Sequence, residues 1–280
     1  MTVDAHQHFW KYNPLRDGWI TEEMGAIRRD FLPSDLEPIL KANRIEACVA
    51  VQADQSEKET EFLLRCAREN SFVKGVVGWT DLKSPQLQAR LEYYHQFDEL
   101  KGFRHIVQAE HEDFLLNSHF QNGVAQLEAY GFTYDILVYV QHLPATVTFV
   151  RKFPHHKFVI DHIAKPLIRD QITEPWAKYI KEIAKSENVY CKLSGMVTEA
   201  DWKGWKKEHF RVYLDTILKA FGPDRLMYGS DWPVCLVAAQ YEQQFDIVQS
   251  FISALSPTEK KDILGENARR FYIFKYYRSS

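Results

Sequence analysis

Eight short runs of apolar and β-branched residues recur along the 280-residue chain, and stretches with helical periodicity separate them. Some of these runs, such as Cys48-Val49-Ala50-Val51, are continuously hydrophobic. That pattern is typical of strands in a parallel sheet that helices cover. The predicted strands span residues 3–8, 47–51, 73–79, 102–106, 133–138, 158–161, 189–193 and 225–228.

Helices are predicted between the strands. Ser56 and Glu59 form a capping box ahead of one helix, and Ser256 followed by Pro257 marks the start of the last one. The capping box opens the segment 57–70, and the other helical segments cover residues 85–100, 122–130, 144–153, 175–187 and 210–221. Strands that alternate with helices, without a linker, predict a single (β/α)8 TIM barrel domain over residues 1–280. A doubly wound open sheet is the alternative, which the absence of a glycine-rich phosphate turn after the first strand disfavours.

A long connection, residues 9–44, follows the first predicted strand. Its first part, from Phe9 to Ile20, is aromatic and poorly periodic. At the carboxyl ends of barrel strands, long loops of this kind usually build binding sites. A structured surface Ω-loop would explain the same composition.

Charge and composition exclude several classes of partner. The net charge is −3 and no block of Lys or Arg stands out, which argues against nucleic acid or an acidic membrane surface. No apolar run approaches the roughly 20 residues of a membrane span, and no basic leader precedes the first strand. The four cysteines are scattered without a CxxC pair, so we expect reduced, mostly buried thiols in a cytoplasmic protein. The sequence specifies no oligomeric state.

Two histidines stand at the end of the first predicted strand. His6 and His8 are two residues apart, so on an extended strand both imidazoles point to the same face. Such a pair can form half of a metal site or a set of hydrogen-bond donors for an anionic or carbonyl ligand. Two polar residues at a strand end are the simpler explanation.

Further polar residues end other strands. His162 follows the sixth predicted strand and Asp231 follows the eighth. Because the carboxyl ends of barrel strands meet at one face, these residues and the two N-terminal histidines predict either a metal site or a hydrolytic site. In the fourth strand only one of Arg104 and His105 can face inward, and we favour Arg104. A buried arginine needs a carboxylate or a ligand as its partner.

Four motifs together carry a resemblance to a known family. They are Asp4-Ala5-His6-Gln7-His8-Phe9-Trp10, Gly102-Phe103-Arg104-His105, Val159-Ile160-Asp161-His162-Ile163-Ala164-Lys165-Pro166 and Tyr228-Gly229-Ser230-Asp231-Trp232-Pro233. On these motifs the chain resembles the amidohydrolase superfamily over essentially its whole length. Within it, the similarity is to the amidohydrolase-2 group of sugar lactonases of the L-fuconolactonase and L-rhamnonolactonase type. The resemblance implies a distorted (β/α)8 barrel and hydrolysis of a lactone with Asp231 as the general base.

Other branches of that superfamily hold one or two divalent metals. Here no carboxylate or lysine suited to bridging two metals ends the fourth or fifth strand, where Gln141 and His142 stand instead. We therefore expect at most one divalent ion, Zn²⁺ or Mn²⁺, which the chemistry need not require. Its candidate ligands are His6, His8, His162 and Asp231.

The leading hypothesis is hydrolysis of a sugar (aldonic acid) lactone, a small-molecule substrate, to the open sugar acid. Asp231 would take the proton of the attacking water, while His6, His8, His162 and Arg104, or the single metal, polarise the carbonyl. The alternatives are a metal-dependent amidohydrolase, an aromatic-acid decarboxylase, or a non-catalytic sugar-acid binder.

Candidate substrate contacts are the remaining aromatic and polar residues at the same strand ends. Each of them is also explained as a core or surface residue. The set comprises Trp10, Gln52, Trp79, Gln108, His142, Lys165 and Trp232. The doublet His155-His156 precedes the sixth strand, at the opposite end of the barrel, and we expect it at the surface.

Overall fold

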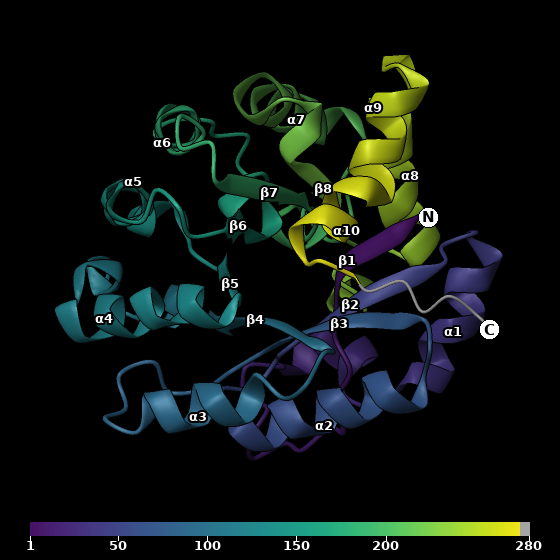
Figure 1. Cartoon of the computed structure of the whole chain (residues 1–280). Coiled ribbons are helices and arrows are strands. Elements are labelled where there is room, and N and C mark those ends of the chain that lie inside the picture. The colour runs from purple at the N-terminus through teal and green to yellow at the C-terminus, as the bar shows by residue number, and fades with distance from the viewer. Residues whose placement is uncertain (275–280) are drawn as a thin grey trace.

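A computed structural model describes residues 1–274, which form the predicted (β/α)8 barrel (Figure 1). All neighbouring strands are parallel, and the sheet order follows the chain from β1 to β8. An open doubly wound sheet would reverse its strand order, so that alternative is wrong. The strands are β1 (Val3–Gln7), β2 (Ala47–Val51), β3 (Val73–Gly78), β4 (Leu100–His105), β5 (Thr133–Ile136), β6 (Phe158–Ile160), β7 (Val189–Leu193) and β8 (Leu226–Tyr228).

Helices surround the strands on the outside of the barrel (Figure 1). No helix is predicted where α1 (Pro33–Ala42) and α8 (Tyr241–Phe251) lie, and the third helix, expected over 85–100, is shorter than predicted. It ends at Tyr94 because β4 already begins at Leu100. The helices are α1 (Pro33–Ala42), α2 (Glu57–Glu69), α3 (Leu87–Tyr94), α4 (Ser118–Leu127), α5 (Leu143–Lys152), α6 (Trp176–Ile183), α7 (Glu208–Phe221), α8 (Tyr241–Phe251), α9 (Pro257–Lys261) and α10 (Asn267–Phe271).

Both predicted serine caps form, but of the two only Ser256 has the reciprocal capping-box bond. The carboxylate of Glu59 accepts from the backbone N–H groups of Ala53 and Asp54 instead. The hydroxyl of Ser56 accepts a hydrogen bond from the backbone N–H of Glu59 at 3.3 Å, which caps α2. Ser256 does the same for Glu259, whose carboxylate accepts from the backbone N–H of Ser256 at 2.8 Å. Each cap satisfies a backbone donor that the first turn of a helix leaves free.

The connection after β1 divides into a folded loop and the crossover helix α1. An isolated bridge between Trp10 and Phe31 closes the loop, with reciprocal backbone hydrogen bonds of 2.9 Å. The buried carboxylate of Asp17 accepts from the backbone N–H of Asn13 at 2.8 Å and from the Nε of Arg16 at 2.7 Å. The loop therefore has a defined shape beside the carboxyl end of β1.

Small apolar side chains fill the interior of the barrel, and the C-terminal helix closes its amino end. Val3, Val49 and Met227 belong to one buried cluster with Phe271 and Tyr272, the last residue of α10 and the one after it. Figure 1 shows α10 beside β1. The floor of the barrel is thus supplied by the far end of the chain.

A glycine lets the first and last strands meet. The backbone N–H of His8 donates to the carbonyl of Trp232 at 2.7 Å, and that of Asp231 donates to the carbonyl of His6 at 2.8 Å. A Cβ at Gly229 would lie 2.7 Å from the Cβ of His6. Any larger residue there would push β8 away from β1 and open the barrel.

The four cysteines are buried and unpaired, as the sequence predicts. Within residues 1–274, no helix has both the length and the apolar character needed to cross a bilayer.

The structure corrects the prediction for one histidine of the doublet before β6. His155 is exposed as expected, but His156 is only 2% exposed. Its ring packs against Phe158, with the ring centroids 4.7 Å apart. Among the described residues its Nε2 has no hydrogen-bond partner, and burial lowers the pKa of His156 to about 4.

Buried His156 should make the fold sensitive to mild acid. The unfolded chain binds a proton at this ring near pH 6.5, whereas the folded chain keeps it neutral to about pH 4. The neutral ring of His156 therefore contributes fully to the free energy of unfolding above pH 6.5, and this contribution is lost as the pH falls toward 4. Between pH 7 and pH 5 this ring should account for a loss of about 2 kcal/mol in the free energy of urea unfolding. His156→Leu should reduce the loss seen in the wild type by that amount, and His155→Leu should leave it unchanged.

Candidate active site

Three buried imidazoles surround one carboxylate at the carboxyl end of the barrel. His6 and His8 come from β1 and the residue after it, His162 follows β6, and Asp231 follows β8. Their Nε2 atoms lie 3.9, 3.3 and 3.8 Å, respectively, from Oδ1 of Asp231. The structure therefore brings together the four residues at which the sequence predicts a metal or hydrolytic site.

A bulge in β1 helps direct the first histidine inward. The pairing of β1 with β2 shifts register between Asp4 and Gln7. Ala5 packs in the cluster inside the barrel, yet the next residue, His6, contacts Lys192 and Asp161 beneath the site. Strict alternation would put adjacent residues on opposite faces, and a bulge is a common way to redirect a side chain.

The hydrogen bonds of His8 fix its tautomer. Its Nδ1 lies 2.7 Å from the backbone carbonyl of Val51, which can only accept, so Nδ1 carries a proton. In a neutral ring, Nε2 then presents a lone pair to Oδ1 of Asp231 at 3.3 Å. Two facing acceptors need a proton or a cation between them. This donor set therefore fits a divalent cation.

Electrostatics favour an ionised carboxylate beside the neutral rings of His6 and His162. Burial lowers the pKa of His6 and His162 well below the usual range for histidine. Burial alone would raise the pKa of Asp231, but His162, His8 and Lys165 hold it below its ordinary value. Ligand atoms of His6, His8 and Asp231 lie within 4.8 Å of one another, which suits one ion.

The side chain of Asp4 fixes the backbone beside Asp231 through hydrogen bonds. Its Oδ1 accepts from the backbone N–H groups of Ser230 at 2.9 Å and of His6 at 3.1 Å, and its Oδ2 accepts from the hydroxyl of Tyr241 at 2.8 Å. Asp231 itself has φ = +58°. Sequence reasoning quoted Asp4 only as part of a motif, and its distance of 226 residues from Ser230 along the chain gave no further signal.

Arg104 lines the cavity, and its neighbour His105 packs outside it. The ring of His105 stacks on Phe114 with centroids 4.8 Å apart. The carboxylate partner expected for a buried arginine is Asp161, whose Oδ2 is 3.0 Å from a terminal nitrogen of Arg104. The other terminal nitrogen donates to the backbone carbonyl of Gln52 and to its side-chain oxygen. The amide of Gln52 is thus engaged by Arg104.

A second buried cation lies deeper in the barrel. Lys192 is fully buried on β7, in contact with Asp135, and its Nζ lies 3.0 Å from Asp161 and 3.1 Å from Nδ1 of His6. Tyr272 donates to Asp135 at 2.9 Å. Burial alone would raise the pKa of Asp161. The charge of Lys192 and the contact between Asp161 and His6 instead hold the pKa of Asp161 well below its ordinary value. Sequence reasoning quoted Asp161 only as part of a motif and found no sign of Asp135, because each lies within a hydrophobic strand or at its end.

A cavity of about 300 Å³ opens over these groups. Its lining includes two of the imidazoles, the carboxylate and Arg104, together with several apolar side chains. The lining residues are His8, Trp19, Ala53, Gln55, Arg104, Ile106, Gln108, Ala109, Leu137, His162, Lys165, Asp231 and Val234. Gln108 and Lys165 therefore stand where the sequence expects them.

Four other predicted contact residues lie behind the cavity wall. Trp10 donates its indole N–H to the carbonyl of Arg29 at 2.9 Å. Trp79, Trp232 and His142 also lie outside the lining set, in contact with His105, Phe31 and Glu110 respectively. Trp19, which sequence reasoning did not single out, lines the mouth instead and is 44% exposed. The only signal for it was its place in the aromatic loop.

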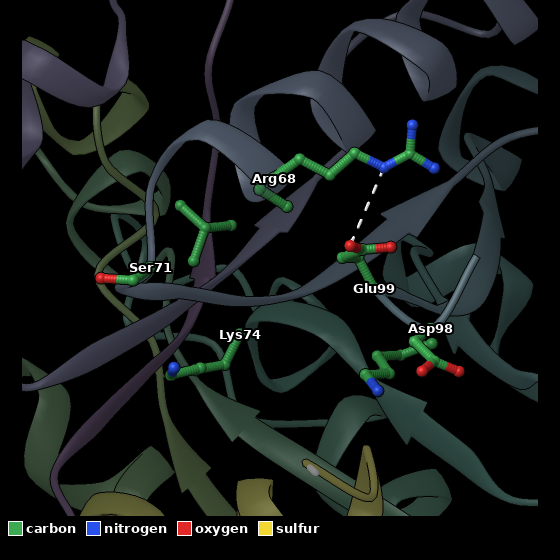
Figure 2. Close-up of a pocket in the computed structure, with 8 residues that line it drawn as sticks. Arg68, Ser71, Lys74, Asp98 and Glu99 are labelled. Carbon is green, nitrogen blue, oxygen red and sulfur yellow. Dashed lines mark ion pairs between the residues drawn. The ribbon is translucent and has the colours of Figure 1, made fainter. Parts of the chain in front are cut away.

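A second hollow lies at the opposite end of the barrel, where β3 and β4 begin (Figure 2). Figure 2 shows Arg68 extended toward Glu99, with Nε 3.8 Å from the carboxylate. Ser71, Lys74 and Asp98 also line it. Because active sites of parallel barrels are built at the carboxyl ends of the strands, we assign the candidate site to the cavity over the histidines.

Comparisons with known proteins agree with this architecture. The family model described as "Amidohydrolase" matches residues 3–274. A protein of Burkholderia multivorans named L-fucono-1,5-lactonase is 40% identical over 97% of this chain and 96% of its own. A protein of the same name from Burkholderia ambifaria is 36% identical over 96% and 94%. A crystal structure of a Burkholderia multivorans amidohydrolase with bound zinc superimposes with a TM-score of 0.95, at 40% identity over 98% of this chain and 100% of that one.

Proposed function

The chain belongs to the amidohydrolase family, and on that basis we propose that it hydrolyses a sugar lactone to the open sugar acid. The observation that carries the proposal is the ring of three buried imidazoles around the ionised carboxylate of Asp231. The two relatives named as lactonases support this class of substrate. A cavity of about 300 Å³ matches a single small ring.

Asp231 has the properties of the general base. Water attacks the lactone carbonyl carbon, the π electrons move to the carbonyl oxygen, and the carboxylate takes the water proton. When the tetrahedral intermediate collapses, the bond between the carbonyl carbon and the ring oxygen breaks. Asp231 returns its proton to that ring oxygen, and the products are a carboxylic acid and a hydroxyl. Its lowered pKa keeps Asp231 ionised, and ready to accept, at neutral pH.

Donors for the developing oxyanion come from His162 and Arg104. The hydroxyl of Ser194 lies 2.9 Å from Nδ1 of His162. When that hydroxyl donates, the proton of the neutral ring sits on Nε2, from which it can be donated to the substrate. Arg104 lines the cavity, and its guanidinium brings a positive charge beside the carbonyl. Such donors stabilise the negative charge that forms in the transition state.

One divalent ion fits beside this machinery. His6, His8 and Asp231 would hold Zn²⁺ or Mn²⁺, with His162 adjacent, because their ligand atoms lie within 4.8 Å of one another. When bound, such an ion supplies Lewis-acid polarisation of the carbonyl. The zinc in the related Burkholderia multivorans structure supports this assignment.

A pH-indicator assay against a panel of sugar lactones tests the proposal. Hydrolysis releases an acid, so we expect acidification with aldonolactones and none with simple amides or aromatic acids. Each reaction is run before chelation, after chelation, and after Zn²⁺ or Mn²⁺ is added back. Loss and recovery of activity would place the ion in catalysis, whereas unchanged activity would leave the histidines as donors only. Turnover of an amide or an aromatic acid in place of the lactones would refute the proposed function.

Gln108 lines the cavity and carries a buried amide oxygen, Oε1, that accepts no hydrogen bond among the described residues. An unpaired buried acceptor is costly unless a ligand supplies a donor. A sugar ring carries hydroxyl donors, and a plain alkyl lactone carries none. We therefore propose that Gln108 selects polyhydroxylated lactones.

Gln108→Met, which keeps the length of the side chain, should expose this selectivity. We expect kcat/KM for the best sugar lactone to fall by about 10- to 100-fold, since one hydrogen bond to a buried group is lost. With δ-valerolactone, which has no hydroxyl, kcat/KM should stay within about threefold of wild type. Equal losses with both substrates would contradict a recognition role and indicate a structural one.

A further inference from the structure

The chain makes a left-handed turn immediately after β6. His162, Ile163, Ala164 and Lys165 have φ values of +52°, +48°, +59° and +45°. L-residues avoid this region because the Cβ approaches the following carbonyl, and a β-branched residue such as Ile163 avoids it most. Four consecutive residues, none of them glycine, adopt it only where their surroundings hold them there.

Specific contacts hold the turn. The backbone N–H of Lys165 donates to the carbonyl of His162 at 2.8 Å. Trp176, on α6, donates its indole N–H to the carbonyl of Ile163 at 2.7 Å. The side chains of Ile163 and Ala164 are fully buried, which anchors the middle of the turn in the core.

Gly195, in the loop after β7, leaves space for the ring of His162 beside the turn. A Cβ at Gly195 would lie 2.4 Å from Nδ1 of His162 and 2.6 Å from its Cγ. The ring has little freedom to retreat, because Ser194 contacts the same Nδ1 at 2.9 Å. Gly195 also has φ = +62°. The residue therefore meets both a backbone requirement and a spatial one.

The turn places two cavity residues on the same side. In a tight turn with three residues per revolution, the first and fourth side chains align. His162 and Lys165 are those residues, and both line the cavity. The ammonium nitrogen of Lys165 forms an ion pair with Oε1 of Glu199, 3.1 Å away. A single strained segment thus sets both the imidazole near Asp231 and the cation beside it.

We propose that Trp176 and Gly195, neither of which lines the cavity, are positioning residues that fix His162 and Lys165 for the reaction. The inference rests on the proposed lactone hydrolysis. Trp176 holds the backbone of the turn, and Gly195 sets how closely the ring of His162 approaches β7.

Gly195→Ala, with Gly131→Ala as its matched control, tests the role of Gly195. Gly131 also has a positive φ, +73°, but a Cβ there would meet no atom of residues 1–274 within 4 Å. Both variants carry the backbone penalty, and only Gly195→Ala displaces the imidazole. We expect kcat of Gly195→Ala to fall about 100-fold, with KM within about threefold, because small misplacements of catalytic groups are costly. If its kcat falls no further than that of Gly131→Ala, the proposal is overturned.

Trp176→Phe provides a second variant that keeps a ring in the core. It should lower kcat about 10-fold, whereas Trp205→Phe, which removes an indole bond to the carbonyl of Ala238, should leave kcat near wild type. Equal effects of the two variants would refute the role of Trp176.

If the wild-type enzyme hydrolyses no lactone, the proposed function fails by itself. Crystal structures then decide the positioning role: an unchanged distance from Nε2 of His162 to Oδ1 of Asp231 in Gly195→Ala would overturn it.

Discussion

Asp231→Asn should lower kcat for lactone hydrolysis by about 100-fold or more while the protein stays folded. The amide preserves the shape of the side chain but cannot take a proton from water. Its loss should appear mainly in kcat, because the base acts in the chemical step. Steady-state kinetics on the best lactone measure the effect, and circular dichroism with thermal unfolding verifies the fold. Near-normal turnover would remove Asp231 from the mechanism.

Asp231→Gly offers a sharper version of the same experiment. Because Asp231 has φ = +58°, glycine fits the backbone without strain, and it leaves space where the carboxylate stood. Added formate should restore part of kcat in Asp231→Gly if proton transfer is what was lost, and it should leave Asp231→Asn unchanged because the amide fills that space. Absence of rescue would favour a role in holding a metal or the loop.

Lys192→Met should destabilise the protein by about 3–5 kcal/mol. Lys192, Asp135 and Asp161 are all fully buried, so the substitution leaves two carboxylates facing each other with one cation fewer. Burial already raises the pKa of Asp135 to about 6 against the opposing charge of Lys192. Urea unfolding at pH 7 measures the loss in free energy.

Two further variants separate charge burial from packing. Lys192→Met combined with Asp135→Asn should recover part of the stability, because one unpaired charge is removed with its partner. Lys185→Met removes an exposed lysine from its pair with Glu182, 2.6 Å away, and should change stability by less than about 1 kcal/mol. If the double variant is no more stable than Lys192→Met, the loss comes from packing. Both Lys192→Met and the double variant should have a kcat below that of the wild type, since each loses the contact between Nζ of Lys192 and His6.

Local patterns in the sequence were enough to predict the barrel fold. Several strands are short apolar runs, and the helices α2 and α9 begin at capping serines, so neighbouring residues contain the signal. The rule that catalytic groups gather at the carboxyl ends of strands then indicated His6, His8, His162 and Asp231. It could not choose among aromatic residues, and the structure lines the cavity with Trp19 and not with Trp10, Trp79 or Trp232.

The sequence by itself determined the strand order, most of the helices and which end of the barrel bears the histidines, because these follow from periodicity and chain direction. Only the tertiary structure decided the bulge in β1, the left-handed turn at His162, and the burial of Lys192 between Asp135 and Asp161. Residues 57 positions apart pair in that last contact. Each of these features is locally unfavourable, and each persists because distant parts of the chain supply the compensating contacts.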